Sequence, residues 1–157
     1  MEKMDKKTRI QVPRFKEENG FYTTPERSKL MSKIKSKNTK PEIKLRKKLW
    51  NLGFRYRLHN KRLPGNPDII LEKFKIVIFV DGEFWHGYNW HEKKLKIKTN
   101  REFWIPKIER NMERDIENDL KIRTLGYKVF RFWEHSIKKD IDLCVNVVQE
   151  YIDELGN

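Results

Sequence analysis

Apolar and polar positions follow different spacings along the chain, and each change of spacing marks a predicted element. Apolar residues three or four positions apart predict amphipathic helices, whereas short or alternating apolar runs between turn residues predict strands. The predicted helices span 26–37, 40–52, 102–124 and 138–155. The predicted strands span 54–58, 68–71, 75–80 and 127–132. This order, with most strands grouped between helices, predicts an α/β fold in which helices cover a mixed sheet.

Capping residues and local composition divide the chain into an N-terminal arm and one folded domain. Thr24 and Thr39 each precede a predicted helix as N-caps. Residues 1–24 are polar and lack periodic apolar positions, so we predict a flexible N-terminal arm over 1–24 and a single domain over 25–157. Within that domain, 82–100 is predicted to be a long loop rich in aromatic residues.

The net charge and the cysteine content limit which kinds of partner and which cellular location we expect for the protein. The chain has 36 Lys and Arg against 23 Asp and Glu, a formal net charge of +13. This excess predicts a polyanionic partner such as nucleic acid; the alternative is a protein with a basic tail. The one cysteine, Cys144, excludes a disulfide framework and a cysteine-based zinc site. No apolar run suffices for a membrane span, and residues 1–9 lack the apolar segment of a secretion signal, so we expect a cytoplasmic protein without a membrane partner.

Two aspartates flank the central predicted hairpin: Asp68 opens one strand and Asp81 closes the next. If the turn lies midway between the strands, Asp68 faces Phe79 and Asp81 is its diagonal neighbour on the same face, roughly 7–8 Å away. Two such carboxylates suit a hard cation such as Mg²⁺, which offsets the charge of a phosphodiester under attack. A register shifted by one residue would separate them, and the alternative is that both are ordinary turn and loop residues.

Aromatic and titratable residues follow these acids. Phe84 and Trp85 are consecutive in a polar segment, so at least one is a candidate for stacking on bases or wedging between them; the alternative is a loop folded back over the hairpin. His86 is a candidate general acid or base. Asn111 and Asp115 share one face of the predicted helix, where Asp115 either orients a catalytic histidine or pairs with a surface arginine.

A set of motifs runs in order through about residues 24 to 140. The set consists of Arg27-Ser28-Lys29, Met31, Ile34, Thr39, Glu42, Leu63-Pro64-Gly65-Asn66-Pro67-Asp68, Val77-Ile78-Phe79, Gly82, Phe84-Trp85-His86, Glu102-Phe103-Trp104, Lys107-Ile108, Asn111, Glu113-Arg114-Asp115, Leu125-Gly126-Tyr127 and Trp133-Glu134. Together these motifs resemble the very short patch repair (Vsr) family of DNA mismatch endonucleases.

The resemblance implies a restriction-endonuclease-like fold, with a central mixed sheet flanked by helices. It implies an enzyme that hydrolyses DNA with Mg²⁺, for which Mn²⁺ can substitute. The implied reaction nicks one strand beside a thymine–guanine mismatch and leaves a 5′-phosphate. The expected partner is double-stranded DNA, together with a functional association with a DNA methyltransferase or with repair proteins.

The resemblance also implies roles for single residues. Asp68 matches the family's metal-binding aspartate, His86 a catalytic histidine, and Asp115 an acid associated with histidine function. Glu42 matches a glutamate of the active-site region. The residues expected to contact DNA are Met31, Phe84, Trp85, Trp104 and Asn111.

Two departures from the family pattern concern metals. Asp81 stands where better-known members have a histidine, and we expect it to act in catalysis and to bind the catalytic ion with Asp68. The places of the family's structural zinc ligands are occupied by Glu83, Tyr88, Trp90 and His135. We therefore expect no structural zinc, and we expect Tyr88 and Trp90 to pack into its place. Glu83 is then free to join the catalytic ion.

Three functions compete at this point. Mismatch nicking is favoured by Phe84, Trp85 and Trp104, because wedging residues suit a distorted duplex. A restriction-type endonuclease, or a subunit of one, that cuts an unmismatched sequence is favoured by Asp81. A non-catalytic DNA-binding module is disfavoured, because both acids and His86 are present. Mismatch nicking is the function we predict.

Overall fold

A four-stranded sheet lies at the centre of the structure, a computed structural model that describes residues 8–156. The strands lie side by side in chain order: β1 (Arg57–Leu58), β2 (Ile69–Leu71), β3 (Ile76–Asp81) and β4 (Lys128–Trp133). β1, β2 and β3 pair antiparallel, whereas β3 and β4 run parallel. The sheet is therefore mixed, and the predicted α/β class is confirmed.

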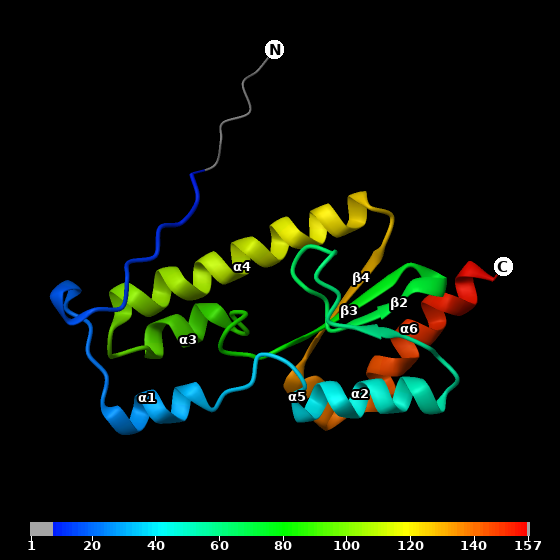
Figure 1. Ribbon diagram of the computed structural model, residues 1–157, viewed down its shortest axis with the longest axis horizontal. Coiled ribbons are helices and arrows are strands. Elements are labelled where there is room, and N and C mark those ends of the chain that lie inside the picture. Colours follow the sequence, from blue (N-terminus) through cyan, green and yellow to red (C-terminus); the bar gives the residue numbers. More distant parts are fainter. Residues whose placement is uncertain (1–7, 157) are drawn as a thin grey trace, which may run out of the picture.

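Helices flank this sheet on both sides (Figure 1). They are α1 (Pro25–Ser32), α2 (Lys40–Asn51), α3 (Trp90–Lys96), α4 (Arg101–Thr124), α5 (Glu134–Lys139) and α6 (Ile141–Leu155). The predicted caps are present: the side chains of Thr24 and Thr39 accept hydrogen bonds from backbone N–H groups at the starts of α1 and α2. No helix within residues 8–156 combines the length and the apolar character needed to cross a membrane.

Both faces of the sheet are buried, because the side chains of β3 alternate between two apolar clusters. Ile76 and Ile78 face the cluster completed by α2, α5 and α6, and Val77 and Phe79 face the one completed by Ile122 of α4. In Figure 1, α4 accordingly lies on one side of the sheet and α2, α5 and α6 lie on the other. A strand covered on both faces has a continuous apolar sequence, as β3 does.

The β2–β3 hairpin has the predicted register. Ile69 pairs with Ile78, so Asp68 falls opposite Phe79, one position beyond the last pair. The turn between the strands is tight, and Lys75 adopts a left-handed φ of 53° in it. Asp68 and Asp81 consequently stand at the same end of the hairpin.

The loop and the last helix differ from prediction. The predicted loop over 82–100 contains α3, and the helix predicted over 138–155 begins at Ile141 as α6, after a separate short helix, α5, that was not predicted. The two helices are separated at Asp140, whose side chain accepts a hydrogen bond from the backbone N–H of Leu143 and so starts a new helix. A local side-chain cap therefore outweighs the continuous apolar period.

Two predicted elements are shorter in the structure. The helix predicted over 26–37 ends at Ser32, and the strand predicted over 54–58 is reduced to Arg57–Leu58. α1 has no buried residue, so no packing extends it beyond its capped first turns.

The apolar stripe of α4 is only partly buried. Trp104, Ile108, Met112, Ile116 and Leu120 recur every four residues, yet Ile108 is fully buried while Ile116 and Leu120 are 64% and 58% exposed. A helix turns about 100° per residue, so a four-residue spacing drifts by about 40° at each step and winds away from the sheet. The buried residues of α4 are Ile108, Asn111 and Ile122.

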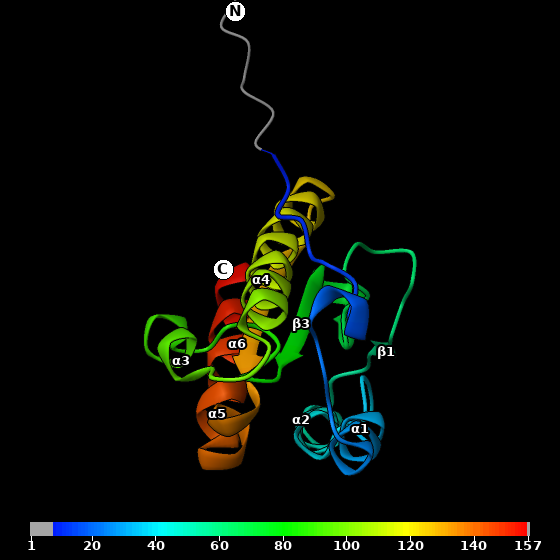
Figure 2. The same cartoon turned by 90° about the vertical axis from the view of Figure 1, so that its left-hand side faces the viewer.

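Part of the predicted arm is packed against α4. Phe21 is 5% exposed and contacts Phe103, with ring centroids 5.6 Å apart. Asn100 joins the same segment through hydrogen bonds to the backbone of Tyr22. Figure 2 shows this segment passing α4 before it reaches α1. Residues 1–7 of the predicted arm lie outside the described residues.

Candidate active site

Asp68 enters the site from the start of β2. Its Oδ2 accepts a hydrogen bond of 2.7 Å from the backbone N–H of Val80, which fixes the carboxylate against β3. Burial raises the pKa of Asp68 to about 7, and the carboxylates of Glu42 and Asp81 add to the rise although the Val80 N–H opposes it. The Asp68 carboxylate therefore lacks a compensating positive charge in the protein alone.

Glu42 reaches the same site from the first turn of α2. Its side chain is 2% exposed. Oε2 accepts a 2.9 Å hydrogen bond from the backbone N–H of Asn38, and Oε1 lies 3.5 Å from the Arg46 guanidinium and 2.9 Å from His59 Nε2. The Thr39 cap sets the start of α2, so it also sets where Glu42 points.

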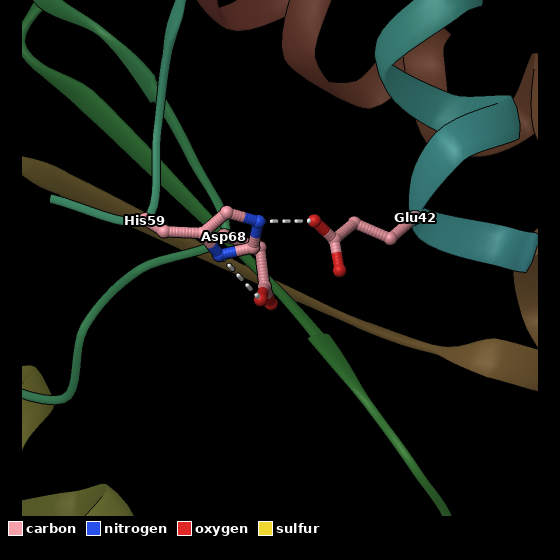
Figure 3. A group of neighbouring side chains, drawn as sticks. All are labelled: Glu42, His59 and Asp68. Atoms are coloured by element: carbon pink, nitrogen blue, oxygen red, sulfur yellow. Dashed lines mark ion pairs between the residues drawn. The ribbon is translucent and has the colours of Figure 1, made fainter. Parts of the chain in front are cut away.

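His59 lies between these two carboxylates, as Figure 3 shows. Its Nε2 is 2.9 Å from Glu42 Oε1 and its Nδ1 is 3.9 Å from Asp68 Oδ1. Sequence analysis missed this residue. The signal that could have found it is the pairing of β1 with β2: Leu58 pairs with Ile69, so His59 falls opposite Asp68.

Glu42, His59 and Asp68 can hold one divalent cation. A ligand atom from each lies within 4.8 Å of the others, and among the described residues this is the group with metal-binding geometry. Two carboxylates and one imidazole form a set of ligands that suits a divalent metal ion. The raised pKa of Asp68 supports the fit, because a cation would supply the missing positive charge.

The structure gives Asp81 a different partner. Its two oxygens each lie 3.0 Å from Nη1 of Arg131, which also binds Asp119. Asp81 therefore stands beside the group of Glu42, His59 and Asp68 but outside it, although its charge contributes to the raised pKa of Asp68. This geometry does not support the expected role of Asp81 as a ligand of the catalytic ion.

Glu83 also has a partner outside the metal-binding group. Its Oε1 accepts a 2.7 Å hydrogen bond from the backbone N–H of His135 and lies 2.8 Å from the Nδ1 of that residue. The Tyr88 ring packs on the His135 ring at 4.5 Å between centroids. Three of the positions matched to zinc ligands thus contact one another, while Trp90 lies apart and donates to Glu109 on α4. Glu83 thus holds this loop through His135 and is not a member of the metal-binding group, although it lines the same cleft as Asp68.

His86 forms a pair with Asp115 of α4. Nδ1 of His86 lies 2.6 Å from Oδ2 of Asp115 and 3.8 Å from Asp81. Burial lowers the pKa of His86, but the hydrogen bond to Asp115 and the charge of Asp81 outweigh it and raise that pKa. The pair leaves Nε2 for the substrate, which supports the orienting role of Asp115 over a surface ion pair.

The predicted DNA-contacting aromatics form one cluster. Phe84, Trp85 and Trp104 meet edge to face, with ring centroids 5.1 to 5.8 Å apart. Phe84 is 40% exposed, so the loop is folded on α4 while one ring remains accessible. Asn111 is 6% exposed and donates to the carbonyl of Trp85. Its amide supports the aromatic loop.

A cleft of about 500 Å³ joins these groups. Its lining residues include Met31, Glu42, Asp68, Phe84, Trp85 and His86. A neighbouring cleft of about 340 Å³ shares Met31 and Phe84 and adds Trp104. α1, the metal-binding group, His86 and the aromatic loop therefore line two adjoining clefts.

Comparisons with known proteins agree with this arrangement. Residues 19–92 match the family described as DNA mismatch endonuclease Vsr. The chain is 47% identical to Type II nicking enzyme V.NmeDIP of Neisseria meningitidis serogroup C, over 82% of this chain and 88% of that protein. It is 44% identical to Type II nicking enzyme V.HpaIIP of Haemophilus parainfluenzae, over 83% and 94%. It is 33% identical to DNA mismatch endonuclease Vsr of Escherichia coli (strain K12), over 82% and 81%.

In metal-free buffer, Asp68→Asn should stabilise the protein at neutral pH. The pKa of Asp68 is about 7 when folded, against an ordinary value of 3.8. The folded state therefore holds the proton more tightly, and the wild type loses stability as the pH rises from about 4 to about 7, on the order of 2–4 kcal/mol. The asparagine variant does not titrate. Urea unfolding between about pH 4 and pH 8 measures the difference, with exposed Asp142→Asn as control. A difference that stays constant with pH would contradict the assignment.

The purified protein should contain no tightly bound zinc. A structural zinc requires a tetrahedral ligand set, usually of Cys and His, and the matching positions hold Glu83, Tyr88, Trp90 and His135. Elemental analysis of untagged protein, dialysed against a mild chelator, measures the zinc content. One zinc per chain that is retained in His59→Ala would contradict the prediction and would point to other residues, such as His86 and His91, as ligands.

Proposed function

We propose that this chain, which belongs to the Vsr family of DNA mismatch endonucleases and is a DNA endonuclease of restriction-endonuclease-like fold, nicks one strand of duplex DNA at a thymine–guanine mismatch with the help of Mg²⁺. One observation carries the proposal. The cleft that contains Asp68, Glu42 and His86 is also lined by Met31 and the aromatic loop. Hydrolysis of the DNA backbone and contact with the DNA bases would thus occur in the same cleft.

Asp68 and Glu42 would hold the cation. A divalent cation bound there neutralises phosphate charge and lowers the pKa of water. The Val80 N–H and the Asn38 N–H fix the two carboxylates before any substrate binds. These backbone bonds keep both side chains in place, which limits reorganisation during the reaction.

His86 would move a proton. The Asp115 contact fixes its Nδ1 and raises its pKa, so His86 carries a proton at a higher pH than an isolated histidine. A protonated Nε2 suits donation to the O3′ atom that leaves when water attacks the phosphorus. Cleavage of that bond leaves the 5′-phosphate expected of the family.

Positive charge would bind the DNA backbone. The net charge of +13 favours binding to a polyanion. α1 buries none of its residues, and Met31 projects from it into the cleft at 36% exposure. A helix held so lightly can follow the groove of a duplex while the sheet holds the site fixed.

The proposed reaction also implies partners. Deamination of 5-methylcytosine produces a thymine–guanine mismatch, so the substrate would arise where a DNA methyltransferase acts. A nick must then be resynthesised and sealed, which requires repair proteins. This association, and the cytoplasmic location it fits, are parts of the proposal.

Restriction-type cleavage of an unmismatched sequence is the alternative. A second acid at the metal would favour this alternative, but in the structure the candidate for that acid, Asp81, binds Arg131. Asp68 and Glu42 remain as the carboxylates of the metal-binding group in this cleft, which Glu83 and Glu134 also line. The geometry therefore favours nicking at a mismatch.

Wild-type protein with Mg²⁺ should nick a mismatched duplex and leave the matched duplex intact. Asp68→Asn should abolish nicking, while its affinity for DNA stays within about tenfold of the wild-type affinity. Asp68 would bind the cation and makes no contribution to the positive surface. Denaturing and native gels separate nicking from double-strand cleavage, and a mobility shift without metal measures binding. Asp142→Asn, on α6, is the control.

Substantial nicking by purified Asp68→Asn would overturn the metal-ligand assignment. Equal cleavage of matched and mismatched duplexes, seen as double-strand breaks on the native gel, would favour the restriction-type alternative. Either result leaves the membership of the family unaffected.

Trp85→Ala should impair nicking of the mismatched duplex more than it weakens nonspecific binding. Stacking on a base is worth about 1–3 kcal/mol, whereas nonspecific affinity depends on Lys and Arg. The control is Trp50→Ala, which removes a half-exposed tryptophan from α2. If nicking, binding and melting temperature all fall together, Trp85 serves only to pack against Phe84 and Trp104.

A further inference from the structure

We propose that His59 is a third ligand of the active-site cation, so that the site combines two carboxylates with one imidazole and shifts in preference from Mg²⁺ toward Mn²⁺. The inference rests on the metal dependence in the proposed function and adds a residue to it. Neither the motifs nor the family match assigns a role to His59.

The position of the ring fits ligation. The His59 side chain is 16% exposed and lies between the carboxylates of Glu42 and Asp68 (Figure 3). Nε2, the ring nitrogen that faces Glu42, is the one that would bind the cation. Ligands at about 2.1 Å from a cation and at right angles to one another are about 3 Å apart. The distance of 2.9 Å between Nε2 and Glu42 Oε1 matches this separation.

The backbone holds the ring in this position. His59 adopts a left-handed φ of 48°, a region that favours glycine and that few side chains occupy without a local constraint. Its N–H donates to the carbonyl of Asp68 at 3.4 Å, one step beyond the pairing of β1 with β2. One backbone contact therefore fixes His59 and Asp68 relative to each other.

A purely positioning role is the competing explanation. In that case His59 would only hydrogen-bond Glu42 and the Asn38 side chain, whose Oδ1 lies 3.3 Å from Nε2. Glu42 already accepts from the Asn38 N–H and lies beside Arg46, so its orientation does not depend on His59 alone. Ligation and positioning differ in chemistry: imidazole nitrogen favours transition metals, whereas Mg²⁺ prefers oxygen.

The test uses Mn²⁺ bound to the full chain without DNA. Pulsed electron paramagnetic resonance should show coupling of the Mn²⁺ to an imidazole ¹⁴N in the wild type. The coupling should vanish in His59→Ala and in His59→Gln, which keeps a hydrogen-bond donor near Glu42. It should persist in His86→Ala and in the control His91→Ala, which alters an exposed histidine of α3.

Titration calorimetry of the same proteins should show the change in preference. His59→Ala should lose about tenfold or more in Mn²⁺ affinity, since losing even an outer-shell partner costs roughly 10–100-fold. Mg²⁺ affinity should fall by a smaller factor, and melting temperatures confirm that each variant is folded. His59→Gln provides the same comparison if His59→Ala fails to fold.

Absence of the ¹⁴N coupling in the wild type, or its persistence without His59, would overturn the proposal. An unchanged ratio of Mn²⁺ to Mg²⁺ affinity would also overturn it. Because binding is measured without DNA, a protein that binds Mn²⁺ through His59 but does not nick a mismatch would contradict the proposed function alone.

Discussion

Repulsion between buried carboxylates is the constraint on which the site depends. Glu42, Asp68 and Asp81 enter one region at the end of the hairpin, and each has a side chain no more than 15% exposed. Water screens such charges poorly once they are buried, so each carboxylate must be protonated, paired or bound to a cation. The positions of Arg131, His59 and His86 follow from this requirement.

Arg131 divides the acids into two groups. It lies across the Phe79 ring, 3.9 Å from its centroid, and binds Asp81 and Asp119 with its guanidinium. Burial works against its charge, but Asp119 and the other carboxylates outweigh burial and raise the pKa of Arg131. Asp81 has Arg131 as a positive partner, although burial still raises the pKa of Asp81. Within residues 8–156, Asp68 has no arginine or lysine partner of this kind, and its pKa rises to about 7. The protein thus supplies a positive charge for Asp81 through Arg131, whereas the positive charge beside Asp68 would come from a bound cation.

Local patterns in the sequence predicted the sheet, the caps at Thr24 and Thr39 and the hairpin register, because each depends on residues close in the chain. The partner of Asp81 was not predictable in this way, since Arg131 is 50 positions away on β4. His59 was missed because its role depends on a pairing across a turn-rich loop. The face of α4 was misjudged because residues four positions apart drift about 40° at each step, so Ile116 and Leu120 turn away from the sheet, whereas Asp115 and Asp119 pair with residues of other elements.

The metal-binding group and the residues proposed to contact DNA differ in how firmly they are held. Asp68 is fixed to β3 through the Val80 N–H, and Glu42 is fixed to a capped helix start. Met31 projects from α1, a helix without a buried residue. Hydrolysis requires ligands placed to within a fraction of an ångström, which strands and capped turns provide. Recognition of a distorted duplex requires adjustment to the DNA, which a lightly packed helix provides. Substitutions in α1 can therefore alter which duplex is bound while the sheet keeps the carboxylates in place.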